Sequence, residues 1–202
     1  QKSLIFARVI DSEYNVKYKY TMKSKVLALI LLCGAASLGA KVKLPALVGD
    51  NMILQQQTEV KLWGTAAPEA EVRVTPSWNG QTMTCRADKD GGWTLAVETP
   101  AAGYTPYEIT FDDGEKTTLK NILIGEVWLA SGQSNMEMPL KGFAGCCIMN
   151  GADDIIVSAE NKGVRMFTVP KHQTYELQTD CKGSWNISSI ETAPDFSATA
   201  YY

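Results

Sequence analysis

The chain has 202 residues, of which 45% are hydrophobic and 20% are charged. This composition is typical of a globular protein with one or two domains. The formal net charge is -3 at pH 7, so the chain lacks the basic surplus that nucleic acids and anionic membranes select in their partners. Nucleic acids and anionic membranes are therefore excluded as expected partners.

Residues 22–40 have the three parts of a secretory signal peptide. Two lysines lie at the start, an apolar core runs from Val26 to Ala36, and small residues follow at 37–40. The apolar run is shorter than the roughly 20 residues of a membrane span. We therefore expect a periplasmic or secreted protein without a membrane-spanning helix. A lipid anchor on Cys33 is the weaker alternative, because two leucines precede it where small residues are expected.

Residues 1–21 stand before Met22, lack an initiating methionine and show no clear periodicity. We interpret them as an untranslated or disordered leader without function.

Four cysteines remain after the signal peptide, and export permits disulfides. They are Cys85, Cys146, Cys147 and Cys181. A bridge from either adjacent cysteine to Cys181 and four free thiols are both open alternatives. No Cys or His spacing indicates a zinc site, and we expect no metal.

From residue 41 to about residue 120, apolar and polar residues alternate between turn signals, as in half-buried strands. The predicted strands are 59–66, 71–78, 91–99 and 107–114. Glycines near 90–92 and 112–114 supply the turns. Short strands at this spacing predict a small antiparallel β-sandwich of immunoglobulin-like type, the all-β part of the chain.

Three tryptophans lie in this region, and two interpretations are open for them. Trp63, Trp78 and Trp93 fill the core, or one of them stacks on a sugar ring. Core packing is the favoured interpretation. Trp78, beside a probable Asn-Gly turn, is expected to be the most exposed of the three.

The pattern changes after Asn121, where residues 122–130 (ILIGEVWLA) are continuously apolar. Such a run is typical of a strand covered on both faces in a mainly parallel sheet. Ser134 follows at the carboxyl end, where α/β sheets place their active sites. A Gly-x-Ser turn at this point predicts an exposed serine nucleophile.

Two neighbours refine this hypothesis. Met136 stands where the ordinary GxSxG elbow has its second glycine, which disfavours an ordinary α/β-hydrolase. Pro139 is expected to confine any helix that begins near Asn135. From spacing alone, Ser134 as a plain helix cap remains the alternative.

The segment GEVWLASGQSNMEMPL (125–140) resembles the first motif of the sialate O-acetylesterase group of SGNH hydrolases. The segment LPALVGDNMILQQQTEVKLWGTAAPEAEV (44–72) is similar to the start of the same group's N-terminal sandwich. DKDGGWTLAVETPAAGYTPYEITF (88–111) and FSATAYY (196–202) match in the same order. The resemblance therefore covers nearly everything after the signal peptide.

The resemblance implies a carbohydrate esterase that removes O-acetyl groups from sialic acids or related acetylated glycans. Ser134 matches the nucleophile, and Gly132, Gln133 and Asn135 match the motif that shapes the turn, pocket and oxyanion hole. The implied mechanism passes through an acetyl-serine and needs no metal or organic cofactor. The implied fold is the β-sandwich at 41–120, followed by the first part of an SGNH-type α/β/α domain at 121–202.

This family also uses a downstream glycine, asparagine and Asp-x-x-His pair that the chain does not show. His172 lies outside such a context and is interpreted as a loop or rim residue. The acidic residues near the motif are expected to be solvated; they are Asp153, Asp154, Asp180 and Asp195. We therefore expect the chain to be an inactive fragment. The alternative function is a non-catalytic glycan-binding or adaptor module.

Overall fold

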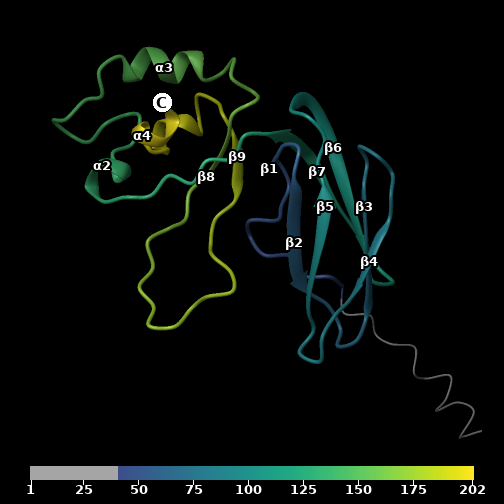
Figure 1. Ribbon diagram of the computed structural model, residues 1–202. Coiled ribbons are helices and arrows are strands. Elements are labelled where there is room, and N and C mark those ends of the chain that lie inside the picture. The colour runs from purple at the N-terminus through teal and green to yellow at the C-terminus, as the bar shows by residue number, and fades with distance from the viewer. Residues whose placement is uncertain (1–40) are drawn as a thin grey trace, which may run out of the picture. The chain divides into compact units, whose positions relative to one another are not determined.

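The computed structural model describes residues 41–202, which lie within one compact unit, 39–202. The leader predicted at 1–21 and the signal peptide predicted at 22–40 lie outside the described residues. The described part of the chain is mostly β-structure with a few short helices (Figure 1).

Seven strands form two sheets in the first half of the described chain. Five of them make one sheet in the order β1-β7-β6-β3-β4, and β2 pairs with β5 in a separate antiparallel ribbon. The strands are β1 (Ile53–Gln55), β2 (Glu59–Thr65), β3 (Glu71–Pro76), β4 (Met83–Arg86), β5 (Gly92–Glu98), β6 (Gly103–Asp112) and β7 (Lys116–Gly125). Their buried side chains form one core cluster.

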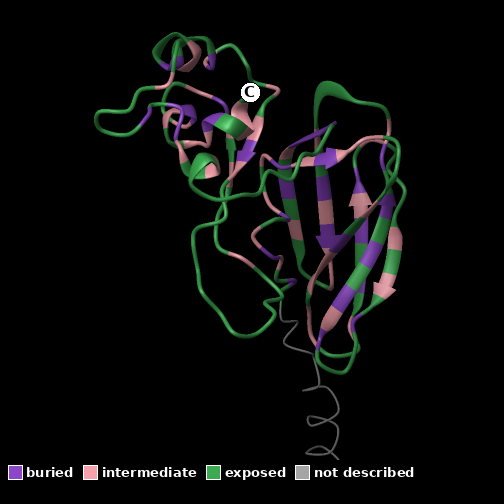
Figure 2. Ribbon diagram, turned by 60° about the vertical axis from the view of Figure 1, so that its left-hand side comes forward, coloured by how far each residue is buried: buried purple, intermediate pink, exposed green. Residues whose placement is uncertain are grey.

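Alternation in the sequence explains why these strands form. On β3 and β5 every second residue is buried, since successive side chains point to opposite faces of a strand (Figure 2). The strands predicted at 59–66, 71–78, 91–99 and 107–114 are confirmed as β2, β3, β5 and β6.

The turn glycine Gly91 has φ +86, and a Cβ there would lie 2.5 Å from the carbonyl oxygen of Ala66. Glycine is therefore required at this turn.

The prediction of a purely antiparallel arrangement is wrong at one edge of the larger sheet. β1 pairs with β7 in parallel, with Ile53 opposite Leu123, so the sheet is mixed. Asn51 and Asn121 precede these paired residues, and both adopt the left-handed region, with φ of 64° and 58°. The Asn121 amide donates to the Asn51 side-chain oxygen at 2.7 Å, which ties the two bends together.

The continuous apolar run at 122–130 does not form one strand. Residues 122–125 end β7 and are all buried, whereas residues 126–133 lie outside any strand. Trp128 and Leu129 are 86% and 95% exposed. The run thus contributes a buried strand to the mixed sheet, and the prediction of a strand inside a mainly parallel sheet is wrong for the described residues.

The second half of the described chain has little regular structure. It contains α2 (Ser134–Glu137), α3 (Gly151–Val157), a 3-10 turn η1 (Ala193–Asp195) and α4 (Ala198–Tyr201), together with the antiparallel pair β8 (Arg165–Phe167) and β9 (Trp185–Ile187). A small second core lies here, built on Leu140, Met166, Ala193 and Ala198. The predicted domain boundaries stay predictions.

The tryptophans pack against the first core, as the favoured interpretation stated. Trp93 is 4% exposed, while Trp63 and Trp78 are partly buried against the same cluster. Trp78 is not an exposed residue, because its ring meets Tyr107 edge-on at 5.7 Å and its Nε1 donates to the Glu98 carbonyl at 2.9 Å. Trp78 is half-buried, as Trp63 is, and both are more exposed than Trp93. That Trp78 is the most exposed of the three stays a prediction.

The four cysteines of the described residues are all free thiols. Cys146 and Cys147 are exposed, whereas burial raises the pKa of the Cys85 thiol. The sequence left open a bridge to Cys181 or four free thiols, and the structure has the four free thiols.

The thiols predict an ordered alkylation pattern. At pH 7 we expect Cys146 and Cys147 to react with iodoacetamide at least about tenfold faster than Cys85, since the thiolate is the nucleophile and burial limits access. Because burial raises the pKa of the Cys85 thiol, its alkylation rate should rise mainly at alkaline pH. Peptide mass spectrometry measures each site, with the chain in denaturant as control. A Cys146 or Cys147 that reacts only after reduction would contradict the free-thiol state.

Candidate functional site

Ser134 is the first residue of α2 and is exposed to solvent. Gln133 precedes the helix with φ -114 and ψ -138, and its carbonyl accepts from the Met136 N–H at 2.9 Å. A Cβ on Gly132 would reach Met136 Cβ at 3.4 Å, which is ordinary contact. The structure thus presents the Gly-x-Ser turn at the surface, as the sequence predicted.

The helix ends where the proline requires it to end. α2 stops at Glu137, and Met138 takes φ -58 and ψ 113 immediately before Pro139. A residue before proline is driven from helical to extended geometry by the proline ring. The prediction that Pro139 confines the helix is confirmed.

The C-terminal segment holds this short helix in place. Thr199 Oγ1 donates to the Asn135 carbonyl at 3.1 Å, and the Ala198 N–H donates to the Met138 carbonyl at 2.8 Å. Ser197 Oγ lies 3.4 Å from Met136 Sδ and also caps α4 by accepting from the Ala200 N–H. The two segments at which the sequence resembles the esterase group, 125–140 and 196–202, are therefore in contact.

A cluster of polar side chains fixes the start of the chain segment that leads to Ser134. The amides of Gln55 and Gln56 donate to the two carboxylate oxygens of Glu126 at 2.8 and 2.7 Å. Gln55 also accepts from the Val127 N–H at 2.9 Å, and Gln56 accepts from the Ala102 N–H at 2.8 Å. The hydrogen bonds from Gln55 and Gln56 lower the pKa of Glu126, because they favour the charged carboxylate.

Sequence reasoning did not identify these three residues as a unit. Gln55 and Glu126 are separated by 71 residues, and neither type is unusual where it stands. The parallel pairing of β1 with β7 sets their two chain ends side by side, and that pairing was not predicted.

No general base accompanies Ser134 in the described residues. In the part of the chain from 41 to 202, the Ser134 hydroxyl makes no hydrogen bond to a histidine or carboxylate. His172 is exposed. Its neighbour Lys171 pairs with Glu137, with Nζ 2.7 Å from Oε2, so this loop contacts α2 through the lysine.

Three of the four acidic residues considered from the sequence make contacts elsewhere. Asp180 accepts from the Ala46 N–H at 2.9 Å, Asp195 pairs with Lys141, and Asp154 accepts from the Tyr202 hydroxyl. Asp153 is exposed on α3. None of them is paired with His172 within residues 41–202, so they do not form a catalytic pair there.

Residues 41–202 contain no group of three or more His, Cys, Asp or Glu side chains placed to hold a metal ion. None of the helices in this range has both the length and the apolar character needed to cross a membrane.

Comparison with known proteins places these features in context. The sialate O-acetylesterase of Rattus norvegicus is 27% identical over 175 residues, which cover 79% of this chain and 31% of that protein. The sialate O-acetylesterase of Homo sapiens is 29% identical over 161 residues, or 74% of this chain and 29% of that protein. No protein-family model matches the sequence.

A solved structure is also similar. It is a novel carbohydrate acetylesterase from Xanthomonas citri, with 31% identity and a TM-score of 0.72 over 79% of this chain and 35% of that chain. This chain therefore spans about a third of the length of the relatives it matches.

Proposed function

We propose, from the premise that this chain is a distant homologue of sialate O-acetylesterases and of a carbohydrate acetylesterase, that it carries the nucleophile segment of a carbohydrate esterase. The substrate class is an O-acetylated sugar or glycan, with O-acetylated sialic acids among the candidates. The observation that supports this most directly is an exposed Ser134 on a turn braced by the C-terminal segment.

The proposed reaction is acyl transfer to Ser134. Its Oγ attacks the acetyl carbonyl and loses its proton to a base, and the sugar hydroxyl leaves with a proton. The tetrahedral oxyanion would be stabilised by backbone N–H groups, including that of Ser134. Water then cleaves the acetyl-serine to acetate and restores the hydroxyl. Gly132, Gln133 and Asn135 would shape the turn and pocket around it.

The proposed fold follows the same homology. The β-rich part would be an immunoglobulin-like sandwich, and residues 121–202 the first part of an SGNH-type hydrolase domain. A TM-score of 0.72 with the Xanthomonas carbohydrate acetylesterase supports this assignment. We further propose that the protein acts in the periplasm or outside the cell, because residues 22–40 have the pattern of a signal peptide.

We expect little or no acetate release from the 202-residue chain itself, because residues 41–202 bring neither a histidine nor a carboxylate to the Ser134 hydroxyl. A chimera is therefore used to test the proposal. In it, residues 41–202 replace the part of the Xanthomonas carbohydrate acetylesterase that they match, and acetate release from acetylated sugars is measured.

The chimera is expected to release acetate, while the 202-residue chain stays at the background rate. A folded chimera without activity would contradict the esterase proposal. If residues 41–120 alone then bound glycans, the alternative of a glycan-binding module would be favoured.

A further inference from the structure

A pocket of about 510 Å³ lies away from the Ser134 turn. One wall comes from β1 and the end of β7, with Ile53, Leu123 and Ile124, and the other from residues 160–164. This volume falls in the range of roughly 300–1,000 Å³ that small-molecule sites occupy. No step of the proposed esterase reaction uses these residues.

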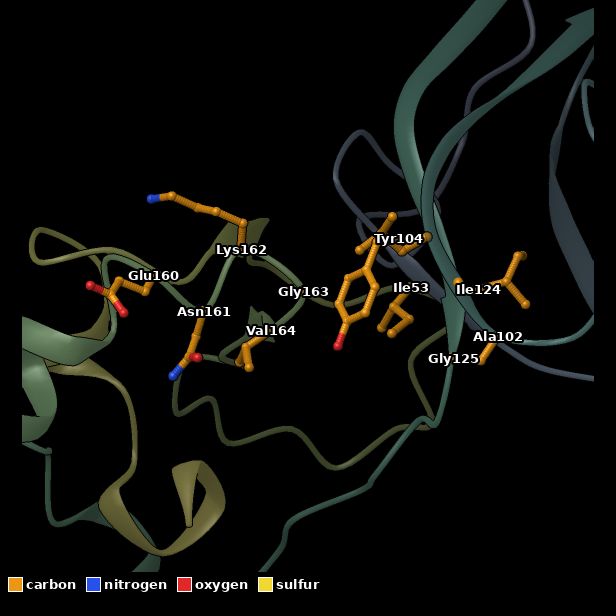
Figure 3. Close-up of a pocket in the computed structure, with 12 residues that line it drawn as sticks. Ile53, Ala102, Tyr104, Ile124, Gly125, Glu160, Asn161, Lys162, Gly163 and Val164 are labelled. Carbon is orange, nitrogen blue, oxygen red and sulfur yellow. The ribbon is translucent and has the colours of Figure 1, made fainter.

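Tyr104 is the central side chain of this pocket. Figure 3 shows its ring extending between Gly163 on one side and Ile53 and Ile124 on the other. The residue is 86% exposed, although its ring is close enough to Gly163 that a Cβ there would lie 2.5 Å from Tyr104 Cε1. The ring is thus held at one edge by backbone while most of its surface stays open to a ligand.

The pocket lining is mainly apolar, with a few polar side chains and no net charge. No residue in the described range 41–202 hydrogen-bonds the Tyr104 hydroxyl, whereas the Asn161 amide donates to the Tyr201 hydroxyl at 3.5 Å. Glu160 and Lys162 contribute one charge of each sign, and the Lys162 amine points away from Tyr104 (Figure 3). An open aromatic surface that carries a free hydroxyl, in a mainly apolar pocket, suits a ligand with an apolar face and hydroxyl groups.

We propose that this pocket binds one pyranose unit of a neutral glycan, with the sugar ring on the Tyr104 ring and a sugar hydroxyl on the Tyr104 hydroxyl. The choice of a sugar rests on the proposed function, since the substrate would carry further sugar units beyond its acetylated one. The pocket is then a second, non-catalytic site that holds the glycan.

The test uses the full 202-residue chain and four neutral probes: cellotriose, xylotriose, maltotriose and triacetylchitotriose. Amide chemical shifts of Gly103, Gly125 and Gly163, which line the pocket, are followed by NMR during titration, with free sialic acid as an anionic comparison. At least one trisaccharide is expected to shift all three signals and to saturate. Absence of shifts with all four, or shifts with sialic acid alone, would overturn the proposal.

Three variants then locate the ligand. Tyr104→Ala is expected to weaken the best probe by at least about tenfold, whereas Tyr104→Phe keeps the ring and should lose less than about threefold. Tyr175→Ala is the matched control, because Tyr175 is fully exposed and lies outside the pocket. Since both tyrosines are exposed, folding should be unaffected, which thermal unfolding checks. Equal affinity of Tyr104→Ala and the unmodified chain would overturn the proposal.

The esterase proposal fails separately from this one. Ser134→Ala should leave probe binding unchanged, because Ser134 does not line the pocket. Binding without acetate release in the chimera would reject only the esterase. Acetate release together with no binding would reject only the glycan site.

Discussion

Replacing Ser134 with alanine is expected to lower acetate release by the Xanthomonas chimera by at least about a thousandfold. Removal of the nucleophile leaves only the rate enhancement from binding and the oxyanion donors. The variant should still fold, since Ser134 is exposed and its side chain is not needed to cap α2. Acetate release at saturating substrate measures the effect.

Ser131 provides the matched control for this variant. It is also exposed and lies three residues earlier in the same turn, but it does not match the nucleophile. Ser131→Ala is expected to keep the rate within about threefold of the unmodified chimera, because exposed substitutions away from reacting atoms have small effects. Equal losses in both variants would show that the turn, rather than the Ser134 hydroxyl, carries the effect.

Phe111→Ala is expected to destabilise the chain by about 3–5 kcal/mol, the usual cost of removing a buried aromatic side chain. Phe111 has 0% exposure, and its ring centroid lies 5.8 Å from that of Trp93. Its truncation would leave a cavity in the core shared by the two sheets. Urea unfolding followed by tryptophan fluorescence measures the free energy of unfolding.

Phe143→Ala is the control for that measurement. Phe143 is 52% exposed and lies outside the core cluster, so its truncation is expected to change the free energy of unfolding by about 0.5 kcal/mol or less. Similar losses for Phe111→Ala and Phe143→Ala would contradict the placement of the core.

The strands that were predictable are those whose signal is local. On β3 and β5 the alternation of Val72 with Val74, and of Trp93 with Leu95 and Val97, indicates both the strand and its buried face. Pairing is a long-range property. The parallel contact of β1 with β7 joins residues 70 positions apart, and the three residues of β1 are too few to show a period.

The apolar run at 122–130 shows the limit of composition as a guide. Continuous burial of Ile122 to Gly125 means that both faces are covered, which is the basis for predicting a strand in a mainly parallel sheet. In the structure β7 is instead the second strand of a mixed sheet. The apolar residues that follow, including Trp128, have no cover within the described residues.

Ser134 was predictable from the sequence, whereas the side chains around the candidate site were not. Ser134 was found from a local turn pattern and from resemblance, and the structure leaves its catalytic role a prediction. Gln55, Gln56 and Glu126 meet only because two strand ends are adjacent. Tyr104 lies before the strand predicted at 107–114 and carries no local signal, because its exposure and its contact with Gly163 depend on the tertiary fold.

The central claim is that Ser134 accepts the acetyl group. The most direct test stops the chimera by acid during turnover of an acetylated sugar and locates acetyl groups by peptide mass spectrometry. The account predicts an acetyl group on Ser134 that forms during turnover and disappears as the substrate is exhausted. Acetate release at an undiminished rate by the Ser134→Ala chimera, with no acetylated serine in either protein, would contradict it.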